Sequence, residues 1–214
     1  MGRKVSTLAF VLSVCGLMAI VGCKKDDTSA PIVTLNGAST VNVDLGGTFT
    51  DPGATATDDV DGDLSSAISV TGTVNANMSG SYPLTYTVAD AAGNVGTASR
   101  TVVVAPSRNS YLGTFTASEN CPPPYNLATT CTISAGTGPN QIVISLFYFN
   151  GGSLTLSVDG ADVTVDAGQA PNPLGESVTG TGTLNASGTV LTMNYTFTPG
   201  AGSPSSCTST YTKN

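Results

Sequence analysis

The sequence predicts an all-β protein with two domains, a β-sandwich followed by a second antiparallel β-barrel or sandwich of about eight strands. Short segments of alternating apolar and polar residues recur along the chain, and no amphipathic helical stretch interrupts them. The composition agrees, because Gly, Thr and Ser are abundant while His and Trp are absent. A polar stretch with a proline, residues 106–110, separates two blocks of predicted strands and is the expected linker.

The N-terminus has the pattern of a lipoprotein export signal. Arg3 and Lys4 precede an apolar run that is long enough for a signal peptide and short for a membrane span. The run ends in Ile-Val-Gly-Cys at residues 20–23, which resembles the lipobox of bacterial lipoproteins. The resemblance implies that residues 1–22 are removed, that Cys23 carries the lipid, and that residues 23–30 form a tether. The alternative is a buried cysteine in a short anchor helix.

The residues directly after Cys23 bear on location. Lys24-Lys25-Asp26-Asp27 resembles the signal that exports lipoproteins to the cell surface in one Gram-negative phylum. It also lacks the Asp at the second position that retains lipoproteins at the inner membrane in enterobacteria. The resemblance implies an outer-membrane protein exposed at the cell surface. The alternative is that four charged residues simply keep the tether soluble and disordered.

The mature chain is expected to be strongly acidic. After residue 22, five basic residues stand against 14 acidic ones, a net charge near −9. This balance argues against a nucleic-acid partner, because such binding depends on Lys and Arg that neutralise phosphates. It argues equally against a basic membrane patch, so the N-terminal lipid is the expected contact with the membrane.

The first block of strands resembles an Ig-like domain. Residues 81–88 alternate strictly, and turn residues at 90–94 connect them to a second β-rich segment, which predicts a hairpin. Residues 80–84 resemble the tyrosine corner of immunoglobulin-type domains, in which a Tyr hydroxyl, here that of Tyr82, bonds back to the nearby backbone.

The whole stretch 31–105 resembles the bacterial Ig-like domain family that recurs in surface proteins and is also appended to some pesticidal crystal toxins. The matching segments are PIVTLNG at 31–37, GTFTDPGA at 47–54, ATDDVDGDL at 56–64, GSY at 80–82 and DAAGN at 90–94. The resemblance implies a spacer or an adhesive module, because the fold itself fixes no function.

Acidic residues cluster in this domain. Asp58, Asp61 and Asp63 lie in one short segment, and Asp90 and Asn94 could approach from a neighbouring turn. Calcium binds six to eight oxygen ligands of this kind, so these five residues are a candidate calcium site. The segment is not an EF-hand loop, since it lacks the Gly and Glu spacing of that loop. The alternative is a solvated turn whose side chains cap their own backbone.

The second domain is expected over residues 111–214. Its predicted strands cover residues 111–117, 130–134, 141–149, 153–158, 162–166, 177–184, 189–197 and 206–212. Turn signals such as Asp159-Gly160 connect them, which predicts a meander of adjacent antiparallel strands. In a closed meander the first and last strands are neighbours.

The segment 141–149 is apolar on both faces. An exposed copy would promote aggregation, so either both faces are covered or the outer aromatics line a binding surface. The domain also resembles small C-terminal β domains of lipoproteins from one Gram-negative phylum, through YLGTFT at 111–116, QIVISL at 141–146 and CTSTYTK at 207–213. That resemblance names no activity.

Three cysteines follow Cys23, an odd number for an oxidising compartment. One disulfide and one free thiol is therefore the simplest expectation. A bond between Cys121 and Cys207 would join the first and last strands of a closed barrel, and a bond between Cys121 and Cys131 is the alternative.

The sequence determines the function of the protein less closely than its fold. Without His no Ser-His-Asp triad can exist, and the order of the acidic residues points to no carboxylate pair, so we expect no catalytic residues. The leading hypothesis is a surface-anchored binding or adhesion lipoprotein with a glycan or protein ligand. The alternatives are a structural subunit of an envelope complex and a lipocalin-like carrier of a small apolar ligand. A packed barrel interior favours the first two, and an apolar cavity favours the third.

Overall fold

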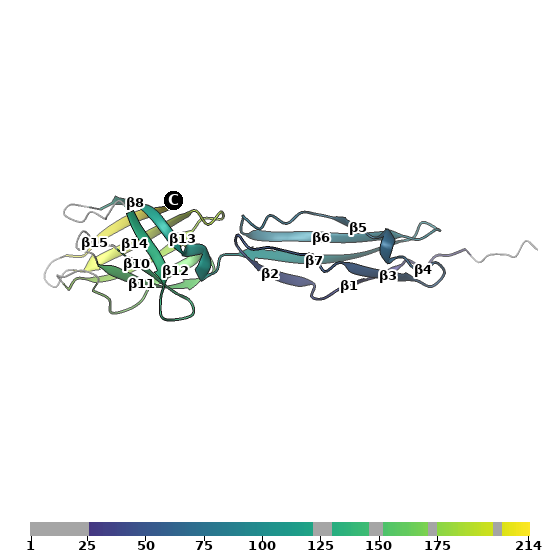
Figure 1. Cartoon of the computed structure of the whole chain (residues 1–214), viewed down its shortest axis with the longest axis horizontal. Coiled ribbons are helices and arrows are strands. Elements are labelled where there is room, and N and C mark those ends of the chain that lie inside the picture. The colour runs from purple at the N-terminus through teal and green to yellow at the C-terminus, as the bar shows by residue number, and fades with distance from the viewer. Residues whose placement is uncertain (1–25, 122–129, 146–151, 171–174, 199–202) are drawn as a thin grey trace, which may run out of the picture.

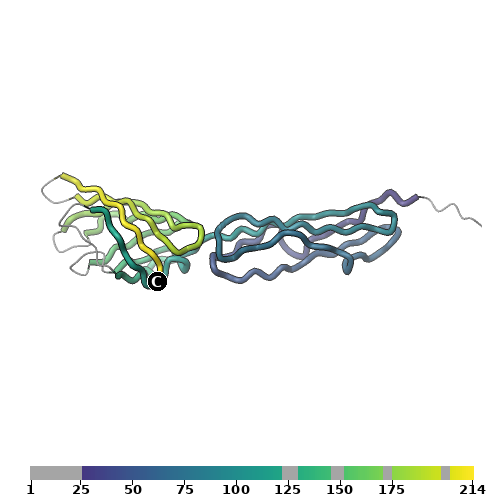
Figure 2. Tube along the Cα trace, turned by 90° about the horizontal axis from the view of Figure 1, so that it is seen from above, coloured from purple at the N-terminus to yellow at the C-terminus, as the bar shows by residue number. Residues whose placement is uncertain are grey.

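The structure, a computed structural model, describes residues 26–121, 130–145, 152–170, 175–198 and 203–214. It confirms the all-β class with two β domains, which lie end to end in an elongated molecule (Figure 1). The tether enters at one tip of this rod, and the second domain forms the other tip (Figure 2).

The first domain is a sandwich of two sheets. Its elements are β1 Ile32–Leu35, β2 Thr40–Asp44, β3 Ala54–Asp58, β4 Gly62–Asp63, η1 Ser65–Ala67, β5 Ser69–Thr71, β6 Gly80–Ala89 and β7 Val95–Ala105. One sheet has the order β1-β3-β4 and the other the order β2-β7-β6-β5. Strands β6 and β7 form the predicted antiparallel hairpin, whereas β2 pairs with β7 in parallel.

The tyrosine corner is confirmed at the start of β6. The hydroxyl of Tyr82 donates a hydrogen bond of 2.7 Å to the carbonyl oxygen of Met78. This bond ties the strand to the turn that precedes it, and it fixes where β6 enters the sheet.

The apolar core of this sandwich is small. Its buried cluster consists of Leu84, Tyr86 and Val102. Half-buried residues from both sheets pack against it, namely Val33, Leu35, Val43, Phe49, Ala54, Ile68, Val74 and Tyr82. Much of the interior surface is therefore only partly removed from water.

A buried arginine supplements that core. Arg100 on β7 is fully buried, and its Nη2 donates to the carbonyl oxygens of Asn36 at 2.8 Å and Gly53 at 3.1 Å. Its Nη1 lies 3.3 Å from Oδ1 of Asp51, which also accepts a 2.6 Å bond from the Tyr86 hydroxyl. Burial and the Asp51 carboxylate raise the pKa of Tyr86 to about 12, so the hydroxyl stays a donor at neutral pH. A buried charge is tolerated only with such partners.

The second domain is a closed barrel of eight antiparallel strands. They are β8 Gly113–Asn120, β9 Thr130–Ala135, β10 Gln141–Ser145, β11 Ser153–Asp159, β12 Asp162–Val165, β13 Ser177–Leu184, β14 Val190–Thr198 and β15 Ser205–Lys213. Each strand pairs with the next, and β15 pairs with β8 to close the barrel. The predicted meander is confirmed, and of the two architectures left open by the sequence, barrel or sandwich, the domain adopts the barrel.

The barrel interior is packed. All eight strands contribute buried side chains to one cluster, which includes Phe115, Ile133, Ile144, Leu156 and Phe197 at 1% exposure or less. This filling arises because inward and outward residues alternate along each strand. A lipocalin-like carrier would need an apolar cavity inside the barrel, so a packed interior favours a binding protein or an envelope subunit over a carrier.

Only part of the segment that is apolar on both faces can be placed. Strand β10 ends at Ser145, with Ile142 and Ile144 fully buried and Val143 half-buried on the outer face. Residues 146–149, with the aromatics of the predicted strand, lie outside the described residues.

The connection between the domains is short and partly helical. The expected linker 106–110 overlaps the start of the 3-10 helix η2 Arg108–Tyr111. The backbone N–H of Ser107 donates to the Ser110 hydroxyl at 3.1 Å, and the backbone N–H of Ser110 donates to the Ser107 carbonyl oxygen at 2.9 Å. Tyr111 is fully buried, and its hydroxyl donates to the carbonyl oxygen of Gly160 at 3.0 Å.

The β13–β14 turn makes a second contact between the domains. The backbone N–H of Ser79 donates to the carbonyl oxygen of Ala186 at 2.8 Å. A Cβ at Gly188 would lie only 2.7 Å from the side chain of Leu45, so the turn fits closely against the end of the sandwich.

Candidate functional site

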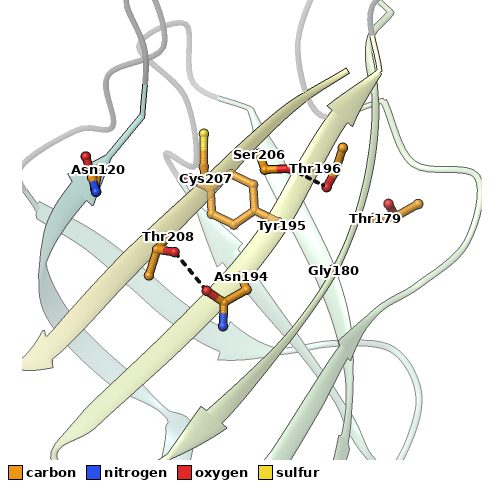
Figure 3. A pocket seen from close by; sticks show the side chains of 9 residues that line it. All are labelled: Asn120, Thr179, Gly180, Asn194, Tyr195, Thr196, Ser206, Cys207 and Thr208. Carbon is orange, nitrogen blue, oxygen red and sulfur yellow. Dashed lines mark hydrogen bonds between the residues drawn. The ribbon is translucent and has the colours of Figure 1, made fainter. Parts of the chain in front are cut away.

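A polar groove runs across the outer face of the barrel (Figure 3). Its volume is about 380 Å³. It is lined by Asn120, Thr179, Gly180, Asn194, Tyr195, Thr196, Ser206, Cys207 and Thr208. Because β-strand side chains alternate between faces, the Thr, Ser and Asn side chains of β8, β13, β14 and β15 point outward here, above an apolar interior.

Cross-strand hydrogen bonds order the groove. Thr208 Oγ1 donates to Asn194 Oδ1 at 2.8 Å, and the hydroxyls of Thr196 and Ser206 lie 3.2 Å apart. Both pairs are directly opposite each other in the β14–β15 register. The lining carries hydroxyl and amide groups without a formal charge, which suits a neutral ligand with many hydroxyls.

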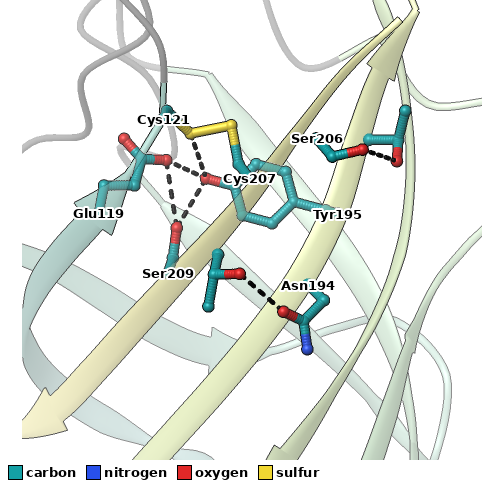
Figure 4. Close-up of a disulfide and its surroundings, with 9 residues drawn as sticks. Glu119, Cys121, Asn194, Tyr195, Ser206, Cys207 and Ser209 are labelled. Atoms are coloured by element: carbon teal, nitrogen blue, oxygen red, sulfur yellow. Dashed lines mark hydrogen bonds between the residues drawn. A yellow bond between two sulfur atoms is a disulfide. The ribbon is translucent and has the colours of Figure 1, made fainter.

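A buried polar network lies beneath the groove (Figure 4). The hydroxyl of Tyr195 donates to the Glu119 carboxylate and lies 2.7 Å from the hydroxyl of Ser209. Ser209 itself donates to Glu119 at 3.1 Å. Burial, above all, raises the pKa of Tyr195, so its hydroxyl remains protonated. The network joins β8, β14 and β15, and because Ser209 is fully buried its hydroxyl is closed to a substrate.

A disulfide between Cys121 and Cys207 lies beside this network (Figure 4). This is the first of the two pairings weighed from the sequence. Cys131 is the buried free cysteine. Burial raises the pKa of its thiol to about 11, so the thiol is protonated at neutral pH.

Carboxylates converge at the opposite tip of the molecule. Asp58, Asp61 and Asp90 come together as the sequence predicted, and Asp27 of the tether joins them. One carboxylate oxygen from each of the four lies within 4.8 Å of those of the others. The sequence reading missed Asp27, because nothing in the local pattern indicates that the tether folds back against the β6–β7 turn.

Asp63 and Asn94 have other roles. The Asp63 carboxylate accepts bonds from the backbone and the hydroxyl of Ser65, which lower its pKa, and Asp63 is not among the four clustered carboxylates. Asn94 Nδ2 donates to Asp90 Oδ2 at 2.7 Å and to the carbonyl oxygen of Asp27 at 3.2 Å. Asn94 thus holds Asp27 and Asp90 beside each other. Asp51, a further acidic residue of the domain, contacts Arg100 instead.

The expected lipid-attachment residue, Cys23, lies outside the described residues. Within the ranges that the structure describes, no helix is long and apolar enough to cross a membrane.

Comparison with solved structures finds distant likenesses. A lipoprotein from Bacteroides thetaiotaomicron is 16% identical with a TM-score of 0.35, over 84% of this chain and 98% of that one. A structure of CBM51-2 in complex with GlcNAc and INT domains from Clostridium perfringens ZmpB is 15% identical with a TM-score of 0.30, over 86% of this chain and 44% of that one. A structure of the M60 catalytic domain of ZmpB with its CBM51-1 and CBM51-2 domains is 14% identical with a TM-score of 0.31, over 87% and 21%. All three TM-scores are below 0.5, so none of these structures bears on function.

No curated protein matches the chain. Residues 33–104, in contrast, match the family model described as bacterial surface protein, Ig-like domain. The match covers the strands of the first sandwich and agrees with the resemblance seen in the sequence. Residues 33–104 therefore form an Ig-like domain of the kind that this family model describes.

Proposed function

We propose that this chain is a non-enzymatic binding lipoprotein of the cell surface, in which the Ig-like domain is a spacer and the barrel carries the ligand site. The observation that carries the proposal is the end-to-end arrangement, with the tether at one tip and the barrel at the other (Figure 1). A rod of this kind places the barrel, and the groove on it, away from the anchor.

The anchor in this proposal is a lipid on Cys23 in the outer membrane. The lipobox at residues 20–23 and the charged segment at 24–27 support it. More than one acyl chain would be needed for stable anchoring. The Cys23→Ser variant should then lose both palmitate label and partition into the detergent phase. Equal label in the variant would contradict the assignment.

Chemistry at the groove supports a glycan as the ligand. Asn194, Thr196 and Thr208 offer amide and hydroxyl groups that can donate or accept, in a groove with no formal charge. The acidic chain, at −7 overall, would repel anionic ligands but would not hinder a neutral one. An enzymatic role gains no support here, since the groove lining has no carboxylate and Glu119, under the groove, is bonded to Tyr195 and Ser209.

A glycan and protein binding array with the soluble fragment 24–214 tests the proposal. Thr208→Lys should fill the groove and abolish binding to the glycans that the unmodified fragment recognises. Thr164→Lys is the matched control, because Thr164 is also an exposed outward Thr, on β12, outside the groove lining. Binding that survives Thr208→Lys would move the site away from the groove. Stoichiometric co-purification with a membrane protein, without glycan binding, would favour the envelope-subunit alternative instead.

A further inference from the structure

Four carboxylates from three parts of the chain meet where the rod joins its tether. Asp27 comes from the tether, Asp58 ends β3, Asp61 lies in the turn that follows it, and Asp90 begins the turn between β6 and β7. One oxygen of each lies within 4.8 Å of those of the others. Like charges at this spacing repel one another and disfavour the arrangement unless a cation neutralises them.

No described basic side chain provides that neutralisation. Among the described residues, the one ion pair joins Arg100 and Asp51, in the interior of the sandwich. The remaining interactions at the cluster are hydrogen bonds from neutral groups. Asp58 Oδ1 accepts from the backbone N–H groups of Val60 and Asp61, and Asp61 Oδ2 accepts from the backbone of Ala91 at 2.7 Å.

Asp58 supplies an independent observation that a ligand belongs here. The residue is only 9% exposed, and its Oδ2 is buried without a hydrogen-bond partner. Leaving a charged oxygen buried and unpaired costs free energy, which a coordinated cation would recover. The hydrogen bonds to Oδ1 fix the carboxylate, so Oδ2 is held in place as a preformed ligand.

We propose that Asp27, Asp58, Asp61 and Asp90 bind a calcium ion that fastens the tether to the Ig-like domain. Calcium accepts six to eight oxygens in irregular geometry, so carboxylates from separate loops, together with water, meet its needs. Asn94 is a positioning residue, because its amide holds both Asp90 and the backbone of Asp27. The site differs from the set predicted from the sequence by gaining Asp27 and by excluding Asp63 and Asn94 as ligands.

Calcium would then set the length of tether that is free between the anchor and the Ig-like domain. With calcium bound, residues from Asp27 onward are held against the domain, and the free part of the tether ends before Asp27. Without calcium, the tether would be released up to the start of β1 at Ile32. This inference concerns the membrane-proximal tip and is independent of any ligand bound by the barrel.

The test uses the soluble chain 24–214 with calcium chloride or with EGTA. Calcium should raise the melting temperature of the Ig-like domain, since it binds only the folded site. Calcium should also slow amide hydrogen exchange at residues 26–30. Asp61→Asn, at an exposed position, should weaken calcium affinity by about tenfold or more without unfolding the domain. Asp27→Asn should remove the slowed exchange of the tether.

Asp59→Asn is the matched control, because Asp59 is exposed in the same turn but is not among the clustered carboxylates. It should respond to calcium like the unmodified chain. Identical melting and exchange in millimolar calcium and in EGTA would overturn the proposal. A calcium effect that persists undiminished in both Asp61→Asn and Asp58→Asn would also overturn it, since it would show general screening of an acidic surface.

Discussion

The two domains use different means to hold β-strands together. The described part of the barrel buries nineteen residues in one cluster, whereas the corresponding cluster of the Ig-like domain has three, so the sandwich has much less apolar burial to stabilise it. In its place the sandwich has a buried arginine that bonds to loop carbonyls and a carboxylate. A thin sandwich can thus be held together by polar cross-links, while this closed barrel relies on its filled interior and one covalent bond.

Breaking the covalent bond should produce the largest effect. Replacing Cys121 and Cys207 by Ser removes a cross-link between residues 86 positions apart. The loss of chain-entropy stabilisation for a loop of this size is about 4 kcal/mol. Calorimetry of the mature chain should show a lower melting temperature for the barrel and an unchanged transition for the Ig-like domain. Reduction of the unmodified protein should reproduce the variant, and a shift confined to the Ig-like domain would contradict the assignment.

Removing the buried charge should be nearly as costly in the other domain. Arg100→Met leaves Asp51 and two loop carbonyls without their donor, which should destabilise the Ig-like domain by about 3 kcal/mol in urea unfolding. Arg108→Met is the matched control, because Arg108 makes one 3.3 Å bond to the carbonyl of Gly138 in the barrel. Equal losses from the two variants would show that the network has no special weight in the sandwich.

The smallest expected effect comes from the tyrosine corner. Tyr82→Phe deletes the 2.7 Å bond to Met78 and should lower the unfolding free energy of the Ig-like domain by about 1 kcal/mol. The exposed neighbour Ser81 provides the reference variant, Ser81→Ala, for which no measurable change is expected. If Tyr82→Phe behaves like Ser81→Ala, the corner contributes nothing beyond the packing of its ring.

The strands of the second domain and their meander order were predictable from the sequence because their signals are local. Period-two alternation marks each strand, and a turn residue such as Gly160, at a φ of 60°, marks where the chain reverses. Closure was not determined by these signals, because eight such strands fit a barrel or a sandwich equally well. The interior of the sandwich was harder to predict from the sequence. Nothing near Arg100 in the sequence indicates that its guanidinium group is buried and contacts Asp51.

The acidic site was only partly predictable for a similar reason. Asp58, Asp61 and Asp63 were grouped because they are close in the sequence. The Asp63 carboxylate, however, accepts hydrogen bonds from the backbone N–H and the hydroxyl of Ser65, two residues along the chain. Asp27 lies far from Asp58 in the sequence, and its contribution depends on the long-range bond from Asn94 to the tether backbone. Local sequence pattern predicts neither which hydrogen bonds a carboxylate will accept from its neighbours nor which distant segment will pack beside it.

The parallel pairing of β2 with β7 determines how the Ig-like domain would respond to mechanical force. If the N-terminus is held by a membrane and the barrel by a bound ligand, tension enters on the N-terminal side of β2 and leaves at the C-terminal end of β7. Because the two strands are parallel, with Thr40 opposite Thr101 and Asp44 opposite Ala105, these two points lie at opposite ends of the ladder. The pull then runs along the strands and loads the ladder hydrogen bonds in shear, so they must break together. A hairpin pulled at its two open ends would instead unzip one bond at a time.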